Sequence, residues 1–242
     1  MRVTDVKRNE NLTTITVQAP TTKPKIFNVF ILDASGSMGG WVHGSRYKTA
    51  ISGLNELLVN IKQDQDSENY TMIVEFEARN IRTTLPLTKT PPETYAGMGC
   101  GGDTPLNQAV GETIEAIVAT RLKDFSINDK ILINVFTDGG ENASRGKYAN
   151  ANFLGDYIKS LESEGVTVTF MGTQSEVNYA INRLNLKASN TLAHDNTSRG
   201  IKMSFDRTVK ARAAYSKSVA SGQDVTEAFY TKSIDDTNNT TK

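Results

Sequence analysis

The chain has 242 residues, and its 27 lysines and arginines balance its 27 aspartates and glutamates. A chain of this length is typical of one large α/β domain with a well-buried core. Positive charge is neither in excess nor gathered in long runs, which argues against a nucleic-acid-binding protein and favours a protein or small-ligand partner.

The single cysteine, Cys100, excludes an internal disulfide and any zinc site built from several thiolates. The first 17 residues contain no continuous apolar stretch of the kind found in secretion signals. No segment approaches the roughly 20 apolar residues that a membrane helix needs. We therefore expect a cytoplasmic protein that has no membrane partner.

Residues 1–24 are expected to form an N-terminal β extension. Within residues 1–19, apolar side chains alternate with polar or small ones on either side of the turn-forming residues 9–11, which predicts two short strands. After a break, residues 26–32 form a near-continuous apolar run. Such a run is typical of a strand that is covered on both faces in a parallel sheet.

The elements that follow alternate between helix and strand. Apolar residues between 45 and 64 recur at intervals of three and four, which predicts a helix. Residues 70–76 predict a strand, and residues 81–87 predict a short neighbour that pairs with it antiparallel at the edge of the sheet. A loop rich in proline and glycine follows over residues 88–103.

A second helix is expected from Thr104-Pro105, because proline is favoured in a first helical turn. Beyond it the alternation continues, with strands predicted at residues 130–136, 166–171 and 191–193 and helices at residues 148–162 and 176–184. This order predicts an α/β fold with a doubly wound, mostly parallel sheet and right-handed crossovers.

A last helix is predicted after residue 198. Its apolar stripe consists of Ile201, Phe205, Val209 and Ala213. Five basic residues are expected on its solvated face: Lys202, Arg207, Lys210, Arg212 and Lys217. We assign residues 25–218 to one domain and expect residues 219–242 to be a polar, flexible tail. Three apolar residues of this tail could dock a partner, but we expect them to pack back onto the domain: Phe229, Tyr230 and Ile234.

Side chains that carry oxygen follow two of the predicted strands. Asp33, Ser35 and Ser37 come directly after the first buried strand, and Asp138 follows a later one. Thr104 stands at the head of the second helix, after a glycine-rich loop. Because ligands gather outside the carboxyl ends of the strands in an open parallel sheet, we expect all five side chains at one rim. Taken singly, each hydroxyl residue could instead cap a helix or a turn.

Carboxylate and hydroxyl oxygens are the ligands that hard cations prefer, and Mg²⁺ is the leading candidate in a cytoplasmic protein. Mn²⁺ and Ca²⁺ remain open alternatives. A site with only two carboxylates leaves the ion electron-poor. Such an ion can accept a further carboxylate from outside the chain, which is a mechanism of binding.

Three motifs resemble those of von Willebrand factor A (VWA) domains. The segment DASGS at residues 33–37 matches their DxSxS motif, Thr104 in GGDTPL stands where they place a metal-binding threonine, and Asp138 in TDG matches their strand-end aspartate. The resemblance covers about residues 25–215. It implies a six-stranded, mostly parallel sheet with helices on both faces and one antiparallel edge strand. It also implies a metal-ion-dependent adhesion site (MIDAS) made of these five residues: Asp33, Ser35, Ser37, Thr104 and Asp138.

This resemblance implies a metal-dependent protein–protein binding module rather than an enzyme, with a partner that supplies an acidic residue to the metal. The loops look most similar to stand-alone bacterial or phage members such as TerY-type tellurite-resistance proteins. That implies an adaptor or assembly factor in stress resistance, phage defence or phage infection. Four residues near the metal are expected to contact the partner: Trp41, His43, Asp103 and Glu141. Trp41 could equally fold back over the first helix.

A serine hydrolase is the main alternative, because Ser37, Asp138 and His194 follow the chain order of an α/β-hydrolase triad. The nucleophile elbow of that fold requires glycine at position 35, where this chain has serine, and Asp33 would then have no role. A phosphate-binding loop is not supported, since no G-x-x-x-x-G-K-[ST] pattern occurs. The metal site is therefore the favoured hypothesis.

Overall fold

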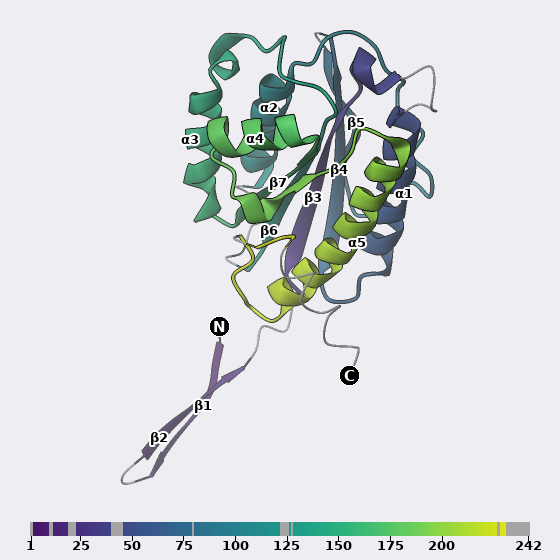
Figure 1. Ribbon diagram of the computed structural model, residues 1–242. Coiled ribbons are helices and arrows are strands. Elements are labelled where there is room, and N and C mark those ends of the chain that lie inside the picture. Colours follow the sequence, from purple (N-terminus) through teal and green to yellow (C-terminus); the bar gives the residue numbers. More distant parts are fainter. Residues whose placement is uncertain are drawn as a thin grey trace, which may run out of the picture.

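A six-stranded sheet in the order β5-β4-β3-β6-β7-β8 forms the centre of the protein (Figure 1). The computed structural model describes residues 2–9, 12–18, 23–39, 46–78, 80–121, 126, 128–226 and 228–230. The strands of the sheet are β3 (Lys25–Asp33), β4 (Glu68–Glu77), β5 (Asn80–Thr88), β6 (Lys130–Phe136), β7 (Val166–Gly172) and β8 (Thr191–Ala193). Neighbouring strands run parallel except β4 and β5, which are antiparallel. The predicted sheet and its antiparallel edge strand are thus confirmed.

Helices cover both faces of this sheet (Figure 1). One face packs against α1 (Arg46–Gln63) and α5 (Ser198–Ala220), and the other against α2 (Leu106–Arg121), α3 (Ala151–Glu162) and α4 (Gln174–Arg183). The described part of the chain also contains three short 3-10 helices: η1 (Gly36–Gly39), η2 (Gly146–Ala149) and η3 (Ala188–Asn190).

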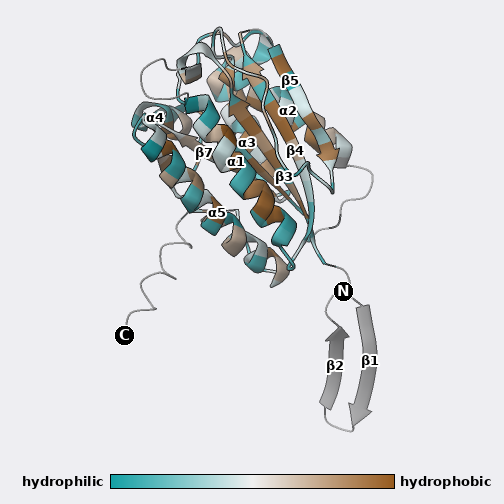
Figure 2. Ribbon diagram, turned by 90° about the vertical axis from the view of Figure 1, so that its right-hand side faces the viewer, coloured by the Kyte–Doolittle hydropathy of each residue, from teal (hydrophilic) through white to brown (hydrophobic). Residues whose placement is uncertain are grey.

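The apolar run of β3 serves both faces, because successive side chains of a strand point in opposite directions. Phe30 and Leu32 belong to the core cluster beneath α1 and α5, whereas Val29 and Ile31 belong to the cluster beneath α2, α3 and α4. In Figure 2, β3 is largely brown, while α1 and α5 change between brown and teal along their length, as amphipathic helices do.

The N-terminal segment forms a separate two-stranded sheet. Its strands, β1 (Arg2–Asn9) and β2 (Leu12–Gln18), pair antiparallel with Asn9 opposite Leu12. The two strands predicted around residues 9–11 are therefore present. None of the helices in the described ranges is long and apolar enough to cross a bilayer.

Arg212 corrects the predicted solvated face of α5. The other four basic residues of that set are exposed, but Arg212 is only 1% exposed. Its Nη2 lies 2.9 Å from Asp64 Oδ2 and also donates to the side chain of Asn69, and its Nε donates to Asn28 Oδ1. The buried face of α5 is wider than the stripe read from the sequence. This buried face can include the cation Arg212 because Asp64 pairs with it.

The same contacts change the pKa of Asp64. Burial alone would raise the pKa of its carboxyl, but hydrogen bonds from Ser216 and Asn69 and the charge of Arg212 together hold that pKa below its ordinary value. The carboxylate therefore stays ionised next to the guanidinium, and the pair joins α5 to the residues that follow α1.

The chain packs back onto the domain after α5, which ends at Ala220. Phe229 and Tyr230 are 2% and 3% exposed, and their backbone N–H groups donate to Asn190 and to Ser189. The predicted packing of these two aromatic residues is confirmed, whereas Ile234 lies outside the described residues. The part of the tail up to residue 230 is thus joined to the core, and the assigned boundary at residue 218 falls inside α5.

The buried pair of Arg212 and Asp64 should make a large contribution to stability. We expect Arg212→Ala to lower the free energy of unfolding by about 3 kcal/mol, because the Asp64 carboxylate would lose its cation. Lys210→Ala, on the exposed side of the same helix, should change it by less than about 0.5 kcal/mol. Urea denaturation followed by circular dichroism measures both. Similar small losses in the two variants would contradict this role of Arg212.

Candidate metal centre

The carboxyl ends of β3 and β6 lie side by side. Leu32 is opposite Phe136 in the register of the two strands, so the residues that follow them leave the sheet at the same place. Asp33 accepts a hydrogen bond from the Thr137 hydroxyl across this junction and another, at 2.7 Å, from the backbone N–H of Ser35. The first predicted ligand is therefore fixed by both strands.

Direct contacts join the two serines to Asp138. The Ser35 and Ser37 hydroxyl oxygens are 3.1 Å apart, and the Ser37 hydroxyl donates to Asp138 Oδ1 at 2.6 Å. Asp33, Ser35 and Asp138 are all buried. The DxSxS segment and the strand-end aspartate thus meet in space, as their positions after the two strands predict.

Gly139 shows that the threonine belongs to the same group. A Cβ atom at this glycine would lie 3.1 Å from Ser37 Oγ, 3.4 Å from Thr104 Oγ1 and 3.8 Å from Asp33 Oδ2. Oxygens from the end of β3 and the turn after it, and from the loop before α2, therefore face one position, which the absence of a side chain at residue 139 leaves open. Together with the contacts of Ser35 and Asp138, this brings all five predicted ligand residues to one rim.

Backbone contacts hold the threonine loop on this rim. The N–H of Gly101 donates to Ala34 O at 2.8 Å, and the N–H of Gly36 donates to Gly102 O at 2.9 Å. Gly102 has φ +71°, a conformation that residues with side chains rarely adopt. The side chain of Asn142 accepts from the N–H of Thr104 at 2.8 Å. These bonds link the loops that follow β3, β5 and β6.

A buried acid in β4 anchors the beginning of the same loop. Glu75 is fully buried and accepts hydrogen bonds from the hydroxyls of Tyr47 and Tyr95. The Tyr47 oxygen in turn accepts from the N–H of Met98 at 2.7 Å. Burial and the neighbouring carboxylate raise the pKa of both tyrosines, so they remain neutral donors. This network is not among the features predicted from the sequence, although an acid inside the apolar strand TMIVEFE is a usable signal.

The two carboxylates of the site have different surroundings. Burial raises the pKa of Asp33 to about 6, although hydrogen bonds from Thr137 and Ser35 lower it and the charge of Asp138 adds to the increase. Asp138 has a cation instead, because Arg46 Nε lies 2.8 Å from its Oδ2. Arg46 is the first residue of α1, and it was not among the predicted site residues.

These residues fit a divalent cation. Asp138 Oδ2 is buried and has no well-oriented hydrogen-bond donor, and the side chains around Gly139 offer only oxygen atoms. Such a set suits Mg²⁺ and other hard cations. Groups of three or more His, Cys, Asp or Glu residues that could hold a metal do not occur in the described ranges. The predicted site differs from such groups because three of its five residues are serine or threonine.

The four residues expected to contact a partner have different positions. The Glu141 carboxylate accepts from the N–H groups of Asn107, at 2.7 Å, and Ser144, also at 2.7 Å, so it caps α2 and closes its own loop. Asp103 is exposed, and its backbone oxygen accepts from Ala78. Trp41 and His43 lie outside the described residues.

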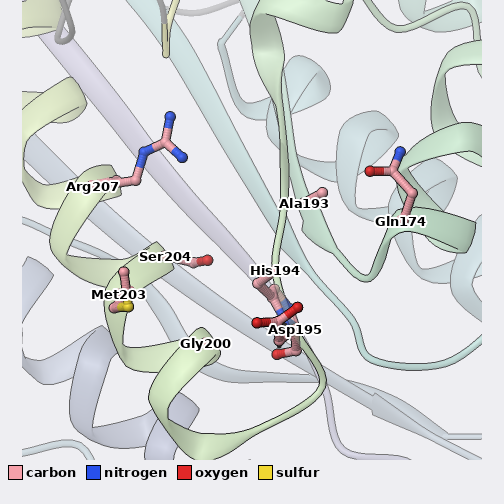
Figure 3. A pocket seen from close by; sticks show the side chains of 8 residues that line it. All are labelled: Gln174, Ala193, His194, Asp195, Gly200, Met203, Ser204 and Arg207. Carbon is pink, nitrogen blue, oxygen red and sulfur yellow. Dashed lines mark hydrogen bonds between the residues drawn. The ribbon is translucent and has the colours of Figure 1, made fainter.

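His194 follows β8 and lines a pocket together with residues of α4 and α5 (Figure 3). Its Nδ1 lies 2.9 Å from Asp195 O, its ring stacks on Phe136, and its Nε2 is buried without a hydrogen-bond partner. Within the described part of the chain, no hydrogen bond joins it to Ser37 or Asp138, and Ser37 donates to Asp138 instead. The hydrolase alternative gains no support from this geometry.

Comparisons with known proteins identify the fold. No protein-family model and no curated protein matches the sequence. The ArnB paralog VWA2 from Sulfolobus acidocaldarius is similar in structure, with TM-score 0.52 and 18% identity over 78% of this chain and 46% of its own. The SpRpn10 VWA domain has TM-score 0.51 and 10% identity over 75% of this chain and 93% of its own. The protein has the fold of a VWA domain.

A third VWA structure is also similar to this fold. The von Willebrand factor type A protein from Catenulispora acidiphila has TM-score 0.52 and 14% identity, over 85% of this chain and 44% of its own. This chain therefore spans less than half the length of that protein and of the Sulfolobus protein. At these identities the likeness describes the VWA fold alone, and the site must be judged from its own geometry.

The raised pKa of Asp33 predicts how stability of this VWA fold changes with pH in the presence of chelator. Between about pH 4 and about pH 6 the unfolded chain loses this proton while the folded chain keeps it. The contribution of Asp33 to the free energy of unfolding should therefore fall as pH rises through this range, by an amount on the order of 3 kcal/mol. Asp33→Asn should remove this fall, and Asp103→Asn, at an exposed carboxyl, should preserve it. Urea denaturation at several pH values measures this. If the free energy of unfolding of Asp33→Asn changes with pH as it does in the wild type, the raised pKa of Asp33 is contradicted.

Proposed function

We propose that the protein belongs to the VWA family and binds a divalent cation, with Mg²⁺ preferred to Mn²⁺ or Ca²⁺. Five side chains would hold the ion: Asp33, Ser35, Ser37, Thr104 and Asp138. One observation carries the proposal, namely that the side-chain oxygens of Asp33, Ser37 and Thr104, which come from two separate segments of the chain, face the open position beside Gly139. The buried Oδ2 of Asp138 supports it, because this oxygen accepts no well-oriented hydrogen bond and depends on a positive charge beside it, which Arg46 supplies here and a divalent ion could supply in its place.

We further propose that the ion binds a carboxylate of a protein partner. Two carboxylates and three hydroxyls leave a divalent ion short of negative charge, so an outside carboxylate can complete its surroundings. The balanced charge of the whole chain favours a protein over a nucleic acid or a membrane surface. Exposed Asp103 lies next to the threonine ligand and would contact the partner, as would Trp41 and His43. Glu141 is a weaker candidate, since its carboxylate is already engaged.

An adaptor or assembly factor in the cytoplasm is the role that this site supports best. The Ser37 hydroxyl is not arranged as the nucleophile of a serine hydrolase, because it donates to an acid rather than to a histidine. We therefore propose a binding protein and not an enzyme. The similarity of its motifs to TerY-type proteins suggests a setting of stress resistance, phage defence or phage infection.

Metal binding can be measured directly by titrating the purified protein with Mn²⁺ in a calorimeter. We expect Asp33→Ala to abolish binding and Thr104→Val to weaken it by about tenfold, since each removes an oxygen from the ion's surroundings. Asp103→Asn changes an exposed carboxyl and should bind like the wild type. Equal affinities in all four proteins would contradict the site.

Partner binding should depend on the same ion. A partner captured from the native host in Mg²⁺ and then purified should dissociate in EDTA, and it should not bind Asp33→Ala in Mg²⁺. The thermal unfolding of that variant serves as the control, because it must remain a folded protein. Capture that survives both EDTA and the substitution would contradict a metal bridge between the two proteins.

A further inference from the structure

Arg46 places a positive charge inside the candidate metal site. Its Nε lies 2.8 Å from Asp138 Oδ2, and its Nη2 donates to the backbone oxygen of Ser37. The Asp138 side chain is fully buried, whereas the Arg46 side chain is 24% exposed. One guanidinium therefore contacts two of the segments that carry predicted ligands, and it does so from the solvent side.

The contact between these two side chains is held by charge and not by good hydrogen-bond geometry. Neither Arg46 Nε nor Asp138 Oδ2 has a well-oriented hydrogen-bond partner, despite their short separation. A strong arginine–carboxylate pair has two parallel N–H···O bonds, and here the second nitrogen is used on a backbone oxygen instead. The charge of the carboxylate is thus neutralised, but its Oδ2 still lacks a well-oriented hydrogen bond. The carboxylate can therefore exchange the guanidinium for another cation.

We infer that Arg46 is a displaceable counter-ion of Asp138 that competes with the divalent metal for this carboxylate. The inference rests on the proposed metal site. A divalent ion that contacts Asp138 would lie within a few ångströms of the guanidinium, and like charges so close repel one another strongly in a buried site. Because Arg46 begins a helix and is partly exposed, its side chain can turn towards water when the metal binds.

This arrangement has a consequence in the absence of metal. Without a cation beside it, the buried Asp138 carboxylate would be costly to the fold. Arg46 supplies that charge, so it stabilises the metal-free protein and weakens metal binding at the same time. Removing it should have opposite effects on these two properties, which a purely structural residue would not have.

Substitutions at Arg46 test this. In calorimetric titrations with Mn²⁺, Arg46→Gln should bind the ion about tenfold more tightly than the wild type, because the competing charge is gone. Arg46→Lys keeps the charge but cannot contact Ser37 and Asp138 together, so it should show a smaller gain. Lys62→Gln removes a positive charge from the other end of α1 and should leave the affinity unchanged.

Thermal unfolding provides a second readout. In EDTA, Arg46→Gln should melt at a lower temperature than the wild type, and saturating Mn²⁺ should raise its melting temperature by more. If Arg46→Gln does not fold, the Mn²⁺ affinity of Arg46→Lys alone tests the inference. A variant that binds Mn²⁺ as tightly as the wild type, or more weakly, would overturn the competition between Arg46 and the metal.

The outcomes separate this inference from the proposed function. Wild-type protein that binds Mn²⁺ and loses it in Asp33→Ala, with no gain in the Arg46 variants, overturns the role of Arg46 and leaves the metal site standing. Absence of Mn²⁺ binding in the wild type and in both Arg46 variants overturns both ideas. Binding that appears only when Arg46 is replaced supports both.

Discussion

The pairing of β3 with β6 is the constraint on which the candidate site depends. The register puts Leu32 opposite Phe136, and Asp33 therefore meets Thr137 where the two strands end. Both strands are buried on both faces, and a shift of one residue would move every side chain to the wrong cluster. The hydrophobic core thus fixes the separation of Asp33 and Asp138, although neither residue belongs to the core.

Polar side chains then attach the loops to that edge. Glu75 receives two tyrosine hydroxyls and so holds the start of the glycine-rich loop, while Asn142 holds its end at Thr104. Buried polar groups are rarely left unpaired, and the buried Glu75 has its partners within the protein. The threonine ligand is therefore positioned by strands and side chains that lie far from it in sequence.

The sequence was sufficient to predict those features of the fold and the site that depend on residues close together in the chain. The apolar run before Asp33 predicted a central strand, and the order of oxygen-bearing residues after each strand predicted the rim at which the structure places them. Arg46, Glu75 and Arg212 could not be paired in this way, because each contacts residues distant in the chain. Arg46 did leave a trace, since a cation is unfavourable at the start of a helix and α1 has no acid in its first turn.

Charge connects these features with the proposed role. Asp33 and Asp138 bring two negative charges to a buried rim, and Arg46 compensates only the second. Burial makes Asp33 reluctant to ionise while no cation faces it, as its raised pKa indicates. A divalent ion would neutralise both acids and leave the guanidinium without a counter-ion. A carboxylate from a partner would then balance the remaining positive charge of the ion and Arg46, so the group that would complete the metal's surroundings would also restore neutral charge at the rim.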